Sequence, residues 1–110
     1  MTRWFRSYWA EEDTWFYFEV DAGGWVTRQV ELQGLHEKPV AAACLADWEA
    51  AQQAGSLADY EATSGATAEA PVREWDGHEP QDLTAEEFET VWLTARATRR
   101  AGAPPRSTGA

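Results

Sequence analysis

The first third of the chain most constrains the fold, because it is rich in aromatic and β-branched residues and contains no proline. Such a composition is typical of strands, and proline is excluded from central strands because it cannot donate a ladder hydrogen bond. We therefore expect three strands, at Arg3–Trp9, Thr14–Val20 and Trp25–Leu32. Turns rich in acids and glycine separate them, at Glu11–Asp13 and Asp21–Gly24, and the second turn predicts a hairpin.

Successive side chains of a strand point to opposite faces of its sheet. In the second strand, one face would carry Trp15, Tyr17 and Glu19, and the other would carry Phe16, Phe18 and Val20, which we expect to be the core face. In the third strand, one face would carry Val26, Arg28, Val30 and Leu32. Arg28 is the charged residue on that apolar face. We expect it to pair with Glu19 or another acid across the sheet, in preference to contacting a ligand.

The middle of the chain is less regular. A further turn is expected at 33–39, and residues 40–45 fit either a fourth strand or the start of a helix. The alanine-rich stretch that follows predicts helix around Asp47–Gln53, ending at Gly55 and Ser56. Residues 61–72 have little apolar mass and predict a mobile acidic loop. Residues 72–75 could then return to the sheet edge.

The clearest helix signal begins at Thr84, which is spaced to cap a helix together with Glu87. Leu83 and Phe88 stand where a hydrophobic staple needs them. The apolar stripe of this helix would consist of Phe88, Val91, Trp92 and Ala95. Residues 102–110, which include two adjacent prolines, predict a disordered tail.

These elements fit one domain, because the whole chain has 110 residues. We predict an α+β fold, in which an antiparallel sheet of three to five strands packs against a C-terminal amphipathic helix. The predicted domain covers residues 1–101. An exposed edge strand leaves both a monomer and a homodimer open.

Charge is the most informative bulk property. The chain has 19 acidic and 9 basic side chains, for a formal net charge of −10. All of the acids but only five of the basic residues precede residue 96. Such a body would repel nucleic acid, whose phosphates need a basic surface, and it would attract a basic protein. The alternative is that the charge serves solubility alone.

The single cysteine, Cys44, allows no disulfide within the chain and fits a reducing cytoplasm. The N-terminal residues resemble neither a signal peptide nor a membrane anchor, so we expect a cytoplasmic protein without membrane contact.

Signatures of catalysis are weak. His36 and His78 lie in two acidic turns, where solvated histidines are more common than metal ligands. Cys44 follows an alanine run that predicts burial, and a buried thiol is inert. The sequence carries no phosphate-binding loop, nucleophile elbow or dinucleotide fingerprint. We therefore predict no catalytic residue, no metal and no cofactor, and we leave enzymatic activity open.

One group of side chains combines aromatic rings with a carboxylate. These residues could share the sheet face that the helix does not cover, and they are Trp4, Tyr8, Trp15, Tyr17 and Glu19. Such a face could be a ligand pocket, a partner interface or a second packing layer under the alanine-rich middle.

The leading hypothesis is a non-catalytic acidic binding protein, such as an immunity or antitoxin-like protein, that captures a basic protein partner. The rival is a small enzyme or ligand-binding module in which Glu19 or a tyrosine acts as acid and base. Arg28 would then orient an anionic substrate. A third hypothesis is an accessory protein of a biosynthetic pathway.

Two blocks carry a family resemblance. Residues 15–34 combine an aromatic-rich strand, a glycine turn and an Arg-x-Val-Glu strand, and residues 83–95 place an acidic pair before Phe and Trp. The chain resembles a family of small uncharacterised bacterial proteins, catalogued as a domain of unknown function. The resemblance implies a fold and no activity. On this resemblance, the following residues would occupy the recurrent positions of the family: Glu19, Asp21, Gly24, Arg28, Val30, Phe88 and Trp92. The long alanine-rich middle departs from that family.

Overall fold

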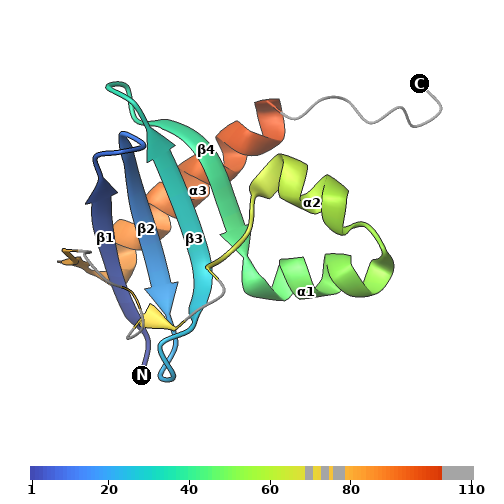
Figure 1. The fold of residues 1–110 in the computed structure, drawn as a ribbon, viewed down its shortest axis with the longest axis horizontal. Helices are drawn as coiled ribbons and strands as arrows, with labels where there is room; N and C mark the ends of the chain where they lie inside the picture. Colours follow the sequence, from blue (N-terminus) through green and yellow to red (C-terminus); the bar gives the residue numbers. More distant parts are fainter. Residues whose placement is uncertain (69–70, 73–74, 76–78, 103–110) are drawn as a thin grey trace.

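The computed structural model describes residues 1–68, 71–72, 75 and 79–102. Its centre is a five-stranded antiparallel sheet with the order β4-β3-β2-β1-β5 (Figure 1). The strands are β1 (Arg3–Trp9), β2 (Thr14–Val20), β3 (Val26–Gln33), β4 (Lys38–Cys44) and β5 (Gln81–Leu83). The helices of the described residues are α1 (Leu45–Ala54), α2 (Leu57–Ser64) and α3 (Ala85–Gly102). The α+β class is confirmed.

The middle of the chain forms a strand followed by two helices beside the sheet edge at β4 (Figure 1). Residues 38–44 form β4, and α1 begins directly after it, so both alternatives for this stretch are found in succession. Gly55 ends α1 with φ 76°, a left-handed conformation that glycine adopts without steric cost. The first four residues of the expected loop at 61–72 instead complete α2.

The expected return of residues 72–75 to the sheet edge is not found at the two of them that the structure describes. Val72 and Trp75 lie outside the strands, while residues 73 and 74 lie outside the described part. The edge strand next to β1 is β5, which pairs with β1 so that Leu83 lies opposite Trp4. Val72 and Trp75 are apolar and pack onto a face of the sheet, whereas β5 directly precedes the start of α3.

Helix α3 starts as the sequence predicts. The Thr84 side chain accepts a hydrogen bond from the Glu87 backbone N–H at 3.0 Å, and the Glu87 carboxylate accepts one from the Thr84 N–H at 2.8 Å. The expected tail at 102–110 lies outside the described residues after Gly102. In the described part of the chain, each helix is too short or too polar to cross a lipid bilayer.

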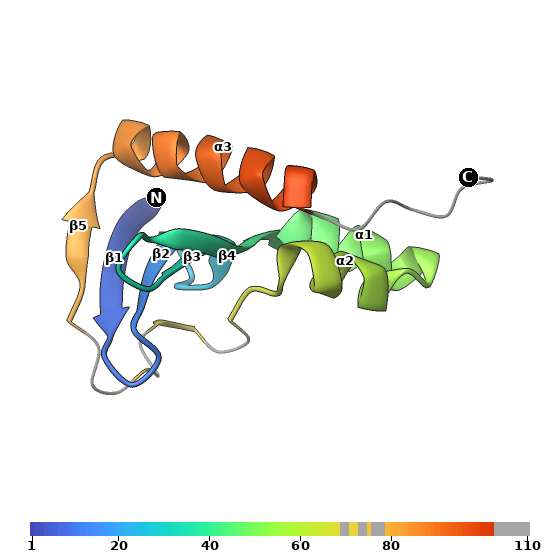
Figure 2. The same cartoon turned by 90° about the horizontal axis from the view of Figure 1, so that it is seen from above.

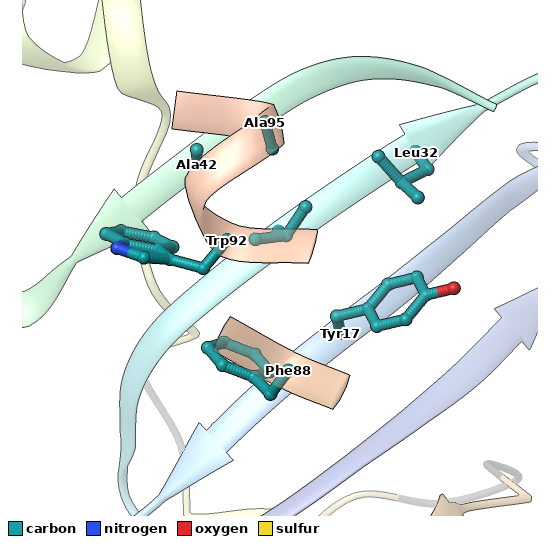
Figure 3. Packing of buried hydrophobic residues seen from close by; sticks show 7 residues of the cluster. Tyr17, Leu32, Ala42, Phe88, Trp92 and Ala95 are labelled. Carbon is teal, nitrogen blue, oxygen red and sulfur yellow. The ribbon is translucent and has the colours of Figure 1, made fainter. Parts of the chain in front are cut away.

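The first core lies between α3 and one face of the sheet (Figures 2 and 3). Phe88 and Trp92 of α3 are 0% and 8% exposed and stack with their ring centroids 6.5 Å apart. The buried cluster consists of Tyr17, Val30, Leu32, Ala42, Phe88, Trp92 and Ala95.

A second core lies on the opposite face of the sheet. Its buried residues are Phe5, Phe18, Val20 and Val26. Phe16, Ala68, Val72 and Trp75 pack against them, and the Val72 N–H donates to the carbonyl of Gly24 at 2.8 Å. The expected core face of β2 is therefore buried, but the other face is buried as well.

A β-bulge changes the facing of one residue. Glu19 pairs with Arg28, but the next pair is Val20 with Val26, so Thr27 is an additional residue in β3. Val26 consequently joins the second core, while Arg28, Val30 and Leu32 face α3. The prediction that all four share one face is wrong for Val26, because strict alternation does not account for a bulge.

Candidate functional site

The six residues singled out from the sequence occupy one face of the sheet. Trp4 lies opposite Glu19, Tyr8 opposite Trp15, and Glu19 opposite Arg28 in the strand register. Tyr17 shares this face and belongs to the core under α3 (Figure 3). The expectation that the helix leaves this face uncovered is wrong. The stripe of α3 packs on it, and the opposite face is covered by residues near the end of the expected loop instead.

Arg28 forms the centre of the polar part of this face. Its Nε and Nη2 atoms donate to the two oxygens of Glu19 at 3.0 and 2.6 Å. The guanidinium also donates to both oxygens of Glu89 from α3, at 3.0 and 3.3 Å. Its Cζ lies 5.0 Å from the Phe88 ring centroid and 5.1 Å from that of Trp92. The expected ion pair is confirmed, and Glu89 is a partner that the sequence did not reveal.

Glu19 uses its carboxylate fully in this arrangement. Thr27 donates to one oxygen at 2.8 Å and the Trp4 indole N–H donates to the other at 3.0 Å, in addition to Arg28. Burial alone would raise the pKa of Glu19, but the hydrogen bonds from Arg28, Trp4 and Thr27 outweigh burial and lower it. A carboxylate held ionised by four donors is suited to fix Arg28, which in turn binds Glu89 of α3. Such a carboxylate is a poor general base.

The other end of the same face is less covered. Arg6 stacks on Trp15 with its Cζ 4.3 Å from the ring centroid, and it donates to the Tyr17 hydroxyl at 3.1 Å. Tyr8 is 46% exposed and donates from its hydroxyl to Asp13 at 2.6 Å. This hydrogen bond, with further contributions from burial and from the charge of Asp13, raises the pKa of Tyr8.

Two turns meet at this end of the sheet, since the Gly34 N–H donates to the Asp13 carbonyl at 2.9 Å. Three large residues are exposed there, and their exposed fractions are 46% for Tyr8, 40% for Trp9 and 89% for Leu35. Four exposed acids accompany them. We call this region the turn-end surface, and it consists of Tyr8, Trp9, Glu11, Glu12, Asp13, Leu35 and Glu37.

A cavity opens on the opposite face of the sheet and reaches the turn-end surface. Its volume is about 310 Å³, within the range of ligand pockets. We call it the aromatic pocket, and the described residues that line it are Trp9, Glu12, Phe16, Phe18, Gln29, Ala68 and Trp75.

Polar groups line one side of the aromatic pocket. Gln29 accepts a hydrogen bond from the Ala68 N–H at 2.8 Å and donates to Glu31 at 3.0 Å. Glu31 lies opposite Phe16 in the strand register. Burial and the nearby charge of Glu12 raise the pKa of Glu31, against the lowering effect of the Gln29 hydrogen bond.

Sequence reasoning missed most of this pocket. It assigned Phe16 and Phe18 to a closed core and gave no role to Trp9 or Glu12. The available signal for this pocket was that a strand ending in an aromatic residue is followed directly by the acidic turn at 11–13. Gln29 and Ala68 meet through folding, and nothing in their local sequence indicates that contact.

Comparisons of the chain with protein-family models, with curated proteins and with solved structures give no match. The resemblance to a family of small bacterial proteins therefore stays a prediction.

Proposed function

We propose that the protein is a non-catalytic binding protein that captures a basic protein partner at the turn-end surface. The observation that carries the proposal is the combination of exposed apolar side chains and exposed carboxylates at one end of the sheet. Immunity and antitoxin-like proteins are one class that fits this description. Such a partner would be met in the cytoplasm, which the single cysteine predicts.

The charges of the turn-end surface support a basic partner. Among the described residues, its four acids have no Lys or Arg partner within 4.0 Å, whereas Arg3, Arg28 and Arg96 are each paired with an acid elsewhere. Lys38 begins β4 at the same end and offsets one of the four negative charges. The remaining negative potential would accelerate the encounter with a positively charged protein.

The apolar side chains supply the short-range part of the interaction. Aromatic residues are enriched at the centres of protein interfaces, where a few anchors provide most of the binding energy. Trp9 and Tyr8 leave opposite faces of the same strand, and Leu35 protrudes from the neighbouring turn. Exposed carboxylates lie in the two turns at this end of the sheet, and polar groups of this kind are typical of the rim of an interface.

The geometry gives the rival enzyme hypothesis less support. In the version of this hypothesis that uses Glu19 as acid and base, Glu19 and Arg28 would act on a substrate, but they bind each other under α3. Their side chains are 16% and 20% exposed. An accessory role in a biosynthetic pathway is compatible with partner capture and stays a prediction.

Affinity capture with matched variants tests the proposal. Immobilised protein is exposed to lysate of the source organism, and the retained proteins are identified, purified and titrated. The turn-end variant Trp9→Ser/Leu35→Ser removes two anchors, and the control Trp25→Ser/Leu93→Ser removes two comparably exposed residues elsewhere. We expect a basic protein that binds the control like the wild type and the turn-end variant at least tenfold more weakly. Equal binding to both variants, or retention of no basic protein at micromolar concentration, would contradict the proposal.

A further inference from the structure

We propose that the aromatic pocket holds an aliphatic cationic group, supplied by a lysine or arginine side chain of the basic partner. The proposal rests on the function proposed above for the source of the cation. The pocket itself is a separate feature, because it lies on the sheet face opposite to α3 and is formed by other side chains. It adjoins the turn-end surface through Trp9 and Glu12, which belong to both.

The pocket walls are aromatic. Trp9 and Phe16 meet edge to face with ring centroids 6.0 Å apart, and Phe16 and Phe18 stack at 6.0 Å. Trp75 packs on Phe18 with a centroid distance of 4.8 Å. Faces of aromatic rings carry partial negative charge and attract cations, most strongly when water is excluded. Methylene groups also pack well on them, as the stems of Lys and Arg do.

Two carboxylates give the pocket a negative charge. Glu12 lines it directly, and Glu31 lies beside it through its contact with Gln29. Gln29 is buried, and its side-chain amide oxygen accepts a hydrogen bond from the Ala68 N–H, so this side of the pocket is fixed. Among the residues that the structure describes, no arginine or lysine forms an ion pair with Glu12 or Glu31. A cation that enters the pocket would therefore meet two negative charges that have no Lys or Arg partner within the described part of the chain.

The shape of the pocket favours a chain with a charged head. Aromatic walls suit an apolar stem, and the carboxylates suit an ammonium or guanidinium at its end. A volume of about 310 Å³ is at the lower end of the range for ligand sites, which fits one side chain better than a large ligand. An anion would be repelled by Glu12, which is the charged residue among the described lining residues.

Titration with side-chain analogues tests the inference on the isolated protein. The indole N–H signals of the isotope-labelled protein are followed by NMR at constant ionic strength. The probes are n-butylguanidinium, n-butylammonium, n-butanol and butyrate. We expect the two cations to shift the Trp9 signal and to saturate with dissociation constants on the order of a millimolar. n-Butanol should bind at least fivefold more weakly, and butyrate should leave the signal unchanged.

Matched variants assign the effect to the pocket. Glu12→Gln should weaken the binding of the cations at least threefold, whereas Glu49→Gln on α1, also exposed, should not. Trp9→Leu should weaken binding, and Trp25→Leu, which removes a Trp of similar exposure at the opposite end of the sheet, should not. Equal binding of n-butanol, or equal effects of Glu12→Gln and Glu49→Gln, would overturn the inference.

Comparison of protein capture with probe binding tests the two proposals separately. Capture of a basic protein without binding of the cationic probes overturns the pocket assignment alone. Probe binding without a captured protein overturns the proposed function and identifies a free organic cation as the source of the group. Probe binding that the purified partner displaces supports both, and displacement should fail when the contacting lysine or arginine of the partner is replaced by alanine.

Discussion

Arg28 and Glu19 form a two-point ion pair across the β-bulge of the sheet, with distances of 3.0 and 2.6 Å. The same guanidinium binds Glu89, so a single side chain connects two strands to α3. These hydrogen-bonded charges therefore lie between the sheet and α3, where they connect structural elements. The turn-end surface, where we propose that a partner binds, lies at the other end of the sheet.

Removal of Arg28 should destabilise the protein. In Arg28→Met, the Glu19 carboxylate keeps its burial but loses its charged partner, and an unpaired buried charge is costly. Because both side chains keep some exposure, we expect a loss of about 2–4 kcal/mol in the free energy of unfolding. Urea denaturation measures it.

Two further variants control that experiment. Glu19→Gln/Arg28→Met removes both charges and should cost less than Arg28→Met alone. Arg3→Met removes the pair with Asp82, whose side chains are 53% and 80% exposed, and should cost less than about 0.5 kcal/mol. An Arg28→Met loss no larger than that of Arg3→Met would contradict the structural role of the ion pair.

Glu31 and Glu19 should affect stability with opposite dependence on pH. The folded pKa of Glu31 is raised above its ordinary value of 4.5, so its ionisation costs stability above that raised pKa. Glu31→Gln should therefore stabilise the protein at pH 7, and the gain should disappear as the pH falls below 4.5. The folded pKa of Glu19 is lowered, so its contribution is present above 4.5 and is lost as the pH falls through the lowered pKa. Unfolding curves of the wild type, Glu31→Gln and Glu19→Gln at several pH values distinguish the two groups, and parallel pH profiles for the two variants would refute the assignment.

The cap of α3 gives a local test. Thr84→Ala removes the side-chain acceptor of the Glu87 N–H and should cost about 1 kcal/mol. Thr90→Ala is the matched control, because Thr90 is exposed within α3 and donates only to the Glu86 carbonyl. Alanine has the higher helix propensity, so this control should be neutral or slightly stabilising. Thermal unfolding of both proteins checks the prediction, which fails if the two variants melt together.

Gly65 should tolerate substitution less well than Gly55, although both have a positive φ. An added Cβ would lie 2.9 Å from the Ala41 Cβ, and its φ is 83°. Gly55 has a similar φ of 76° with open space around it. Gly55→Ala should cost about 1 kcal/mol from backbone strain, and Gly65→Ala should cost more because the Ala41 Cβ is fixed to the β4 backbone, which must also move. Equal losses in denaturant unfolding would show that this close contact is unimportant.

Local sequence signals predicted much of the fold. The turns, the three N-terminal strands and the capping box of α3 depend on residues close together in the chain, and the structure confirms them. The charge pattern also anticipated the pairing of Arg28 with Glu19. The bulge at Thr27 could not be predicted, because Val26 and Val30 fit strict alternation in the sequence although the extra residue places them on opposite faces.

The site was harder to predict for a similar reason. Alternation identified the two faces of β2, but it could not tell which face α3 would cover, since both carry aromatic residues. The aromatic pocket depends on Trp75 and Ala68 reaching β2 and β3 from more than thirty residues away in sequence. Long-range packing of this kind has no local signature.

Mapping of the captured partner onto the isotope-labelled protein by amide NMR tests the central claim most directly. The account predicts that the largest signal changes fall at residues 8–13 and 34–37, and that added salt weakens the binding. Changes concentrated around Trp25 or along the exposed face of α3 at Leu93, with the turn-end signals unaffected, would contradict it.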